Sequence, residues 1–402
     1  MQPLQDLKVL DLAWVVAGPL IGRTLADFGA TVVRVENPRR LDTARVLGPF
    51  PKGETDPQAS VAFDNCNAGK FGLTLDLNRE DAREVARDLA VWADVVIESF
   101  VPGQMAKFGL DYPRLKAINP SLIMVSSSLM GQTGPNAELT GFGNIGAAMS
   151  GLQRLVGGRG EPPIGPFGPY TDYVAPRFSL LALLAAIDRR RRTGEGRHLD
   201  ISQVEATVGM IAPQILDFEA NGRIAEANGN RDDQYSPNGV FRTRGEDRWV
   251  AITARSDEEW RRLASLIGGS VLADDPRFAT LAARKANEDA LEAIIAAWTA
   301  DQDALAVERR LQAEGVPAHI AAESADIVAD PQLLARGSFV KLPHPRSGET
   351  VIDAARYDLS ETPAQYPRAA PTFGQDNPYV LAELLGYPEA RIEALRAAGA
   401  LC

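Results

Sequence analysis

Cysteine and histidine are scarce in this chain, which has two cysteines and three histidines among its 402 residues. Cys66 and Cys402 are too few for a disulfide framework, and the histidines lie too far apart in sequence to show the spacing of metal ligands. We therefore expect neither a disulfide scaffold nor a metal site, and a chemistry that depends on other side chains.

Long apolar runs and an excess of positive charge are also missing. A strongly apolar stretch, 180–187, lies between Arg177 and Asp188 and is too short to span a membrane, and the first residues show no signal-peptide pattern. The formal net charge of −11 disfavours nucleic acid and anionic membranes as partners, although a local basic pocket is compatible with a small anionic ligand. We expect a cytoplasmic protein with no nucleic-acid or membrane partner.

Two common catalytic loops are absent. The segment 141–146 matches the pattern GxGxxG of dinucleotide-binding loops, but no strand immediately precedes it. The loop that follows the first expected strand, 14–19, contains one glycine. No Gly-x-Ser-x-Gly elbow occurs, so the serines at 126–128 are interpreted as the polar end of a strand. These observations disfavour nicotinamide chemistry and a serine nucleophile.

The first half of the chain does contain apolar strands that alternate with helices. Strands separated by helices of this length predict right-handed βαβ units and a mostly parallel sheet, so the expected fold class is α/β. The expected strands are 9–12, 31–35, 73–77, 95–97 and 122–125, and the expected helices are 20–28, 79–92, 174–187 and 204–221.

A chain of this length exceeds the size at which one hydrophobic core usually stops growing, so we expect two domains. The polar, turn-rich segment 228–233 breaks the α/β pattern, and a hairpin and three helices are expected after it. We predict a large domain over 1–224, a smaller α+β domain over 225–330, and a segment 331–402 that returns to the large domain.

Asp172 is the most informative residue of the chain. It follows a Gly/Pro-rich approach, 165–171, and precedes the apolar helix expected over 174–187, whose first turn contains Pro176. Free backbone N–H groups and the positive end of the helix dipole can hold a carboxylate at such a place. Two interpretations are a helix N-cap, which aspartate commonly provides, and a functional carboxylate.

Asp172 belongs to a series of motifs that run in one order along nearly the whole chain. The others are 9–12 with 17–19, 25–30, 33–36, 67–70 with 75–77, 93–103, 131–135, 193–196, 275–278, 315–317 and 374–377. Together they resemble the family III CoA-transferases, a formyl-CoA transferase-like superfamily. A match of this extent is far more specific than any single motif.

The resemblance implies a Rossmann-like large domain with a smaller domain, and two subunits that interlock as rings, either a homodimer or a heteromer of homologous chains. It implies no permanently bound cofactor, because a coenzyme A thioester is the substrate. It also implies that Asp172 attacks the donor thioester to form a mixed anhydride, which CoA thiolate converts into an enzyme–CoA thioester.

The resemblance also suggests residues that face coenzyme A. The backbone of Val16 and Ala17 is expected to assist catalysis, and Val15 belongs to the same loop. Lysines and arginines of the set are candidates for the phosphates. The expected nucleotide and pantetheine contacts are Val15, Val16, Ala17, Arg39, Lys70, Ser99, Phe100, Lys107 and Phe108, with Arg40 nearby.

Two departures bear on the substrate. Val16 stands where formyl-CoA transferases carry a glutamine, and their glycine-rich lid is absent around 228–239. Oxalate and formate are therefore disfavoured as acceptors. The segments 14–19 and 42–50 look most like the branch that uses succinyl-CoA and a substituted dicarboxylate, in which benzylsuccinate CoA-transferase subunits of aromatic degradation come closest.

Two alternatives remain open at this level. Some enzymes of this fold are α-methylacyl-CoA racemases, which pair the aspartate with a histidine. The matching position here is Phe142, and no histidine occurs between residues 1 and 197. The other alternative is a non-catalytic subunit that supports a homologous chain, against which the presence of Asp172 argues.

Overall fold

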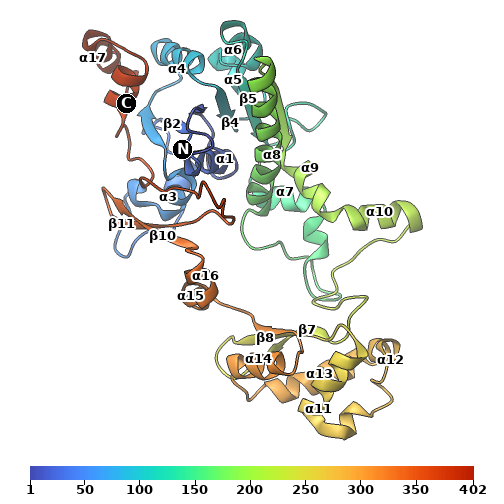
Figure 1. Ribbon diagram of the computed structural model, residues 1–402. Coiled ribbons are helices and arrows are strands. Elements are labelled where there is room, and N and C mark those ends of the chain that lie inside the picture. Colours follow the sequence, from blue (N-terminus) through green and yellow to red (C-terminus); the bar gives the residue numbers. More distant parts are fainter. The chain divides into compact units, whose positions relative to one another are not determined.

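The computed structural model describes all 402 residues (Figure 1). Its largest sheet has six strands. Its strands are β1 Lys8–Asp11, β2 Thr31–Glu36, β3 Phe71–Thr74, β4 Val95–Glu98, β5 Ile123–Ser128 and β6 His198–Ser202. All pair in parallel in the order β3-β2-β1-β4-β5-β6. The predicted α/β class is confirmed. The chain moves outward from β1 to β3 and then crosses to β4, which leaves a topological switch between β1 and β4, where α/β proteins commonly bind ligands.

Two features of the sheet differ from the sequence-based expectation. The third strand ends at Thr74, whereas the pattern predicted 73–77. The strand β6 was not predicted at all, because its residues alternate between polar and apolar and it lies at an edge of the sheet, where only part of each side chain is covered.

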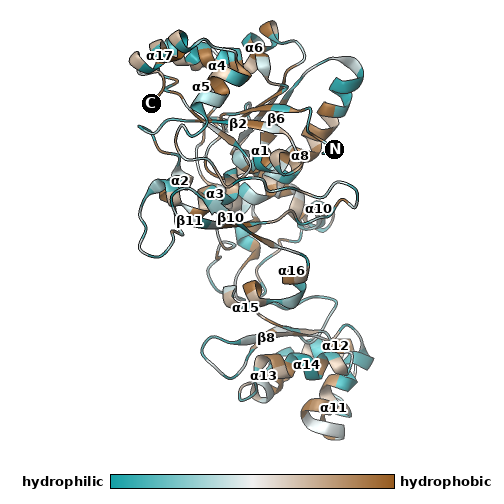
Figure 2. Ribbon diagram, turned by 60° about the vertical axis from the view of Figure 1, so that its left-hand side comes forward, coloured by the Kyte–Doolittle hydropathy of each residue, from teal (hydrophilic) through white to brown (hydrophobic).

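Helices cover both faces of the sheet. On one face, α1 (Ala17–Asp27) and α8 (Tyr170–Thr193) bury Ile21, Leu25 and Leu183 against the strands. The other face is covered by α4 (Glu80–Trp92), α5 (Gln104–Phe108), α6 (Tyr112–Ile118) and α17 (Glu389–Ala397). Figure 2 shows hydrophobic colouring along α8 that gives way to hydrophilic colouring at its arginine-rich end. None of the helices combines the length and the apolar composition that crossing a membrane would require.

The chain divides into two units. The large unit comprises 1–152, 166–220 and 334–402, and the small unit comprises 153–165 and 221–333. Residues 153–165, which the sequence placed in the large domain, therefore group with the small one. The remaining helices of the large unit are α2 Thr43–Val46, α3 Val61–Asn67, α7 Gly143–Met149, α9 Gln203–Val208 and α10 Ala212–Asn221, with 3₁₀ turns at Pro57–Ala59 and Gly209–Ile211. A third 3₁₀ turn, Leu152–Leu155, lies where the chain passes into the small unit.

The small unit has its own sheet and core. Three antiparallel strands, β7 Asn238–Arg242, β8 Trp249–Thr253 and β9 Ala318–Ile320, lie in that order. Trp260 and Phe278 are buried among aliphatic side chains of the surrounding helices. These helices are α11 Asp257–Ala273, α12 Leu281–Ala286, α13 Glu288–Thr299 and α14 Ala304–Ala313, and α15 Ser324–Ala329 follows β9.

The last segment completes the large unit. After α16 (Pro331–Ala335), the hairpin β10 Phe339–His344 and β11 Gly348–Asp353 leads to a π-helical turn, Tyr379–Leu384, and to α17. On the way, Asp376 Oδ2 accepts a hydrogen bond from Gly72 N at 2.8 Å, and Asn377 Oδ1 accepts one from Thr74 N at 2.9 Å. These side chains satisfy the outer N–H groups of the edge strand β3.

Candidate active site

Asp172 is the third residue of α8, because this helix begins at Tyr170. The expected helix start at residue 174 was therefore too late, and the N-cap interpretation is wrong, since Pro169 occupies that position without a side-chain cap. Pro176 lies in the second turn instead of the first. Because proline has no N–H, the carbonyl oxygen of Asp172 has no donor four residues further along the helix.

The carboxylate of Asp172 is held by donors from two other segments. Its Oδ2 accepts a hydrogen bond at 3.2 Å from Gly143 N, the first residue of α7, and the side chain of Gln203 lies near enough to act as a further donor that lowers the pKa of the carboxylate. Asp172 is 5% exposed. Burial raises its pKa to about 6, whereas the hydrogen bonds from Gly143 and Gln203 act to lower it. The carboxylate is thus ionised at neutral pH but poorly solvated, which suits a nucleophile.

Two glycines allow α7 to approach α8 closely. A Cβ atom on Gly143 would lie 2.5 Å from the backbone carbonyl of Pro169, and one on Gly146 would lie 2.6 Å from Thr171 Oγ1. Any side chain at residue 143 would therefore push the Gly143 N–H away from Asp172. The GxGxxG match at 141–146 serves helix packing at the site of the aspartate.

Thr171 and Gln203 form a second layer behind the carboxylate. Thr171 Oγ1 donates to Gln203 Oε1 at 3.0 Å, and both side chains are buried. With its oxygen engaged in this way, the amide of Gln203 presents its NH₂ group as a donor. No motif in the sequence points to Gln203, which lies at the start of α9 and more than 30 positions away from Asp172.

The loop after β1 is fixed through its backbone. Trp14 N donates to Ser99 Oγ at 2.8 Å, and Val15 N donates to both carboxylate oxygens of Asp42 at 3.0 and 3.2 Å. Val16 is the N-cap residue of α1 and provides no side-chain cap, and Ala17 is the first residue of the helix. The N–H groups of Val16 and Ala17 have no hydrogen-bond partner within the chain, as expected at a helix start.

An aromatic cleft of about 40 Å³ lies where β1, β2, β3 and β4 end. Its walls include Phe100 and Phe108, two of the residues that the sequence singled out, together with Trp14. The ring centroids of Trp14 and Phe100 are 6.3 Å apart, and those of Phe100 and Phe108 are 5.9 Å apart. The guanidinium of Arg40 lies 5.2 Å above the Trp14 ring. Flat aromatic walls suit a planar ligand that stacks on them.

Lys70 has a different environment from the one that a phosphate contact requires. Its Nζ donates to Asp11 Oδ2 at 2.6 Å, to Asn67 Oδ1 at 2.8 Å and to Pro19 O at 2.8 Å. The side chain is fully buried. All three donors of the ammonium group are therefore used within the protein, and we leave Lys70 out of the candidates for direct phosphate binding.

The other predicted CoA contacts lie on the surface or at the loop. Lys107 is an exposed residue of α5. Arg39 is also exposed, with its nearest carboxylate partner, Asp76, 3.7 Å away. Both cations are free to meet a phosphate. Ser99 instead uses its hydroxyl to hold Trp14 in the loop after β1.

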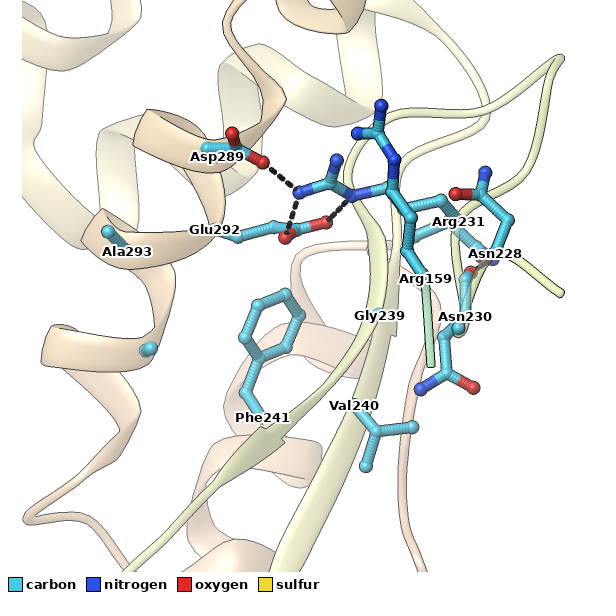
Figure 3. Close-up of a pocket in the computed structure, with 13 residues that line it drawn as sticks. Arg159, Asn228, Asn230, Arg231, Gly239, Val240, Phe241, Asp289, Glu292 and Ala293 are labelled. Atoms are coloured by element: carbon cyan, nitrogen blue, oxygen red, sulfur yellow. Dashed lines mark hydrogen bonds and ion pairs between the residues drawn. The ribbon is translucent and has the colours of Figure 1, made fainter. Parts of the chain in front are cut away.

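The small unit contains a larger hollow of about 710 Å³ (Figure 3). Arg231 donates to Glu292 at 2.8 and 2.7 Å and also to Asp289. The pKa of Asp289 is lowered by its hydrogen bond to Arg231 and further by the charge of Arg159. Two guanidinium groups thus face two carboxylates, so this hollow offers no net positive charge to an anion.

Comparisons with known proteins identify the family of the chain. The sequence matches CoA-transferase family III over residues 4–377. It is 34% identical to succinyl-CoA–D-citramalate CoA-transferase of Chloroflexus aurantiacus, over 98% of this chain and 97% of that protein. It is also 34% identical to succinate–glutarate CoA-transferase of Agrobacterium fabrum, over 95% of this chain and 96% of that protein.

A solved structure shares the fold. A CaiB/BaiF family protein from Brucella suis superposes with a TM-score of 0.88 at 34% identity, over 95% of this chain and 99% of that one. The buried carboxylate with its donors, the parallel sheet and these full-length similarities lead to one conclusion: the chain belongs to CoA-transferase family III and is an enzyme of that class.

Proposed function

We propose that the enzyme moves coenzyme A from succinyl-CoA to a substituted succinate or a related dicarboxylic acid, with Asp172 as the nucleophile. The observation that carries the proposal is the buried carboxylate of Asp172, which is held by two donors and is ionised above pH of about 6. The relatives named for D-citramalate and glutarate support a dicarboxylic acceptor, and citramalate is itself a substituted succinate.

The reaction proceeds through two anhydrides. The Asp172 carboxylate attacks the thioester carbon of succinyl-CoA, the C–S bond breaks, and CoA leaves as its thiolate. This thiolate then attacks the aspartyl carbon of the mixed anhydride, which releases succinate and leaves an aspartyl–CoA thioester. The acceptor carboxylate attacks that thioester, and the thiolate finally attacks the acceptor's acyl carbon, which frees Asp172. Each step exchanges one activated acyl group for another.

Neighbouring groups support these steps. Gly143 N–H and the amide of Gln203 keep the carboxylate oriented while it is poorly solvated, and the burial of Asp172 protects the anhydride from water. We assign the unpaired N–H groups of Val16 and Ala17 to the oxyanion that forms on the thioester oxygen. We assign the aromatic cleft of Phe100 and Phe108 to the adenine of CoA, with Arg39 and Lys107 for its phosphates.

Racemase chemistry has less support. Phe142, the residue before Gly143, stands at the position where a racemase would carry its partner base, and its side chain has no titratable group. A second base for α-proton transfer is therefore missing from that position.

The assembly proposed with this function is an interlocked dimer, with a second copy or a homologous chain. Apolar side chains along α8 are exposed, with Leu181 at 72% and Leu184 at 47%. These exposed leucines on the longest helix support a partner that covers them. Light scattering after size-exclusion chromatography should show no folded monomer, and a stable monomer at the chain mass would contradict the assembly.

A substrate panel tests the function. With succinyl-CoA as donor, turnover of methylsuccinate, citramalate, benzylsuccinate and glutarate is compared with that of oxalate, formate and carnitine. We expect substituted succinates to be preferred. Benzylsuccinate is included because the loop at 14–19 resembles that of the benzylsuccinate CoA-transferase subunits. Equal or faster turnover of oxalate contradicts the substrate proposal. If no acid is used, the assay is repeated after co-expression with a homologous chain, which tests whether this chain is a supporting subunit.

A second assay tests the mechanism. Incubation with succinyl-CoA alone should place CoA on the peptide that contains Asp172, detected by its mass and cleaved by hydroxylamine. An active enzyme that never forms this adduct contradicts the role of Asp172.

A further inference from the structure

Three successive N–H groups in the loop between β1 and α1 are bound by side chains from three different parts of the chain, and two of these side chains, Asp11 and Asp42, are buried. Ala13 N donates to Asp11 Oδ1 at 3.0 Å, Trp14 N donates to Ser99 Oγ, and Val15 N donates to Asp42. The next two N–H groups, of Val16 and Ala17, are unpaired. The N–H groups of residues 13–15 are thus all hydrogen-bonded, and the free N–H groups begin at residue 16.

The last fixed residue, Val15, has an unfavourable backbone conformation. Its φ angle is 68°, in the left-handed region that β-branched residues rarely adopt. Such a conformation persists only when the surroundings enforce it. The two hydrogen bonds from Val15 N to Asp42 are the polar contacts that enforce it here.

Asp42 is itself firmly held. It is 3% exposed, accepts a hydrogen bond from Ala44 N at 2.9 Å, and is paired with the fully buried guanidinium of Arg34. Arg34 lies 3.7 Å from Asp11, the partner of Lys70. The loop is therefore hydrogen-bonded to a buried cluster formed by the carboxylates of Asp11 and Asp42 and the cations of Arg34 and Lys70. The ammonium of Lys70 points into the protein because it belongs to this cluster.

We propose that Asp42 is a positioning residue for CoA transfer: it holds Val15 in the left-handed conformation and so sets the direction of the Val16 and Ala17 N–H groups. This inference rests on the proposed function, in which these donors bind the thioester oxyanion. Such donors act on the transition state more than on the bound substrate, so their displacement lowers kcat more than it raises KM.

The variant Asp42→Asn tests the inference. Both carboxylate oxygens accept hydrogen bonds, so an amide NH₂ in place of either one meets another donor, from Val15 and Ala44 or from Arg34. We expect kcat to fall on the order of 10²-fold, with KM for succinyl-CoA within about threefold of the wild-type value. If this variant does not fold, Asp42→Glu keeps the charge for Arg34 and displaces the contact with Val15, with the same expected result.

Asp27→Asn is the matched control. Asp27 lies at the other end of α1 and is paired with Arg23 at 3.2 Å, so this change also removes a buried ion pair without touching the loop. Its kcat, per folded molecule, should stay within about threefold of the wild-type value. A kcat of folded Asp42→Asn that is unchanged, or that equals that of the control, overturns the inference.

A double-mutant cycle with Val15→Gly separates positioning from a merely structural role. Glycine adopts the left-handed conformation without strain, so a loop with Gly at 15 depends less on Asp42. The Asp42→Asn change should therefore lower kcat at least about tenfold less in the Val15→Gly background than in the wild type. An equal loss in both backgrounds shows that Asp42 does not act through Val15, and overturns the inference.

Formation of the Asp172–CoA adduct keeps the two proposals apart. If wild-type enzyme turns over without the adduct, the proposed mechanism fails, whatever Asp42 does. If the wild type forms the adduct and Asp42→Asn forms it at the same rate, only the positioning role fails.

Discussion

Asp172 Oδ2 lies 3.2 Å from Gly143 N, so the carboxylate in the first turn of α8 also accepts the first N–H group of α7. Two helix N-termini thus meet at one negative charge, and both favour its ionised form. Burial opposes this and raises the pKa. The site holds a carboxylate that is charged at neutral pH although it has almost no contact with water.

Asp172→Asn should abolish transfer but stabilise the protein at pH 8. Because the folded-state pKa is raised, the native protein binds this proton more tightly than the unfolded chain does. The charged group therefore costs stability above pH 6, and the cost disappears as the pH falls toward 4. A change in pKa from 3.8 to about 6 corresponds to about 3 kcal/mol.

Thermal unfolding of both proteins across pH measures this effect. The Tm of Asp172→Asn should exceed that of the wild type at pH 8, and the difference should shrink as the pH falls through about 6. A lower Tm of the variant at pH 8 would show that the carboxylate stabilises the fold and that its burial has no cost.

The rate of adduct formation should fall at acidic pH. Only ionised Asp172 can attack, and its pKa is about 6, so below this pH the single-turnover rate should drop about tenfold per pH unit. Measurement with succinyl-CoA alone avoids titration of the acceptor acid. A rate that stays constant down to about pH 4 would assign Asp172 an ordinary pKa instead.

Gly143→Ala should remove most of the activity. Its Cβ would lie 2.5 Å from the Pro169 carbonyl, so α7 must move away from α8 and the hydrogen bond to Asp172 is lost. We expect a loss of stability of about 1–3 kcal/mol from this overpacking and a decrease in kcat/KM of at least about 10²-fold. Gly209→Ala is the control, because a Cβ atom there meets nothing within 4 Å and should leave both values nearly unchanged.

Lys70→Gln distinguishes a structural lysine from a phosphate contact. The change removes the close ammonium partner of the buried Asp11 and leaves it only the longer contact with Arg34 at 3.7 Å, which should cost about 3–5 kcal/mol of stability. Tm should fall, whereas KM for succinyl-CoA should change little in the folded fraction. Lys52→Gln, at an exposed lysine of the same unit, should leave Tm unchanged. A raised KM with an unchanged Tm would return Lys70 to the phosphate-binding residues.

The strands that are buried on both faces could be predicted from the sequence, because such strands are mostly apolar. Apolar strands such as β1 and β4 are covered on both faces and read as continuous apolar runs, whereas β6 lies at an edge and carries His198 and Asp200. The start of α8 was placed too late, because Pro176 was interpreted as a first-turn proline when the helix in fact continues through it.

The candidate site was predictable only in part. Asp172 was singled out because it lies between a Gly/Pro-rich approach and an expected helix. Gly143 and Gln203 were missed as its donors, because each comes from another helix and meets the aspartate only after folding. Lys70 shows the opposite error, since a charged residue looks like a surface residue until its buried partners are known.

The closure of β3 by Asp376 and Asn377 has a consequence for synthesis of the chain. The two N–H groups that they satisfy belong to Gly72 and Thr74, some 300 positions earlier. During synthesis on the ribosome, the outer N–H groups of β3 therefore stay unpaired until the rest of the sheet and the small unit have been synthesised. An unpaired edge of this kind invites pairing with another nascent chain. We therefore expect Asp376 and Asn377, near the C-terminus, to protect the edge of β3 against aggregation.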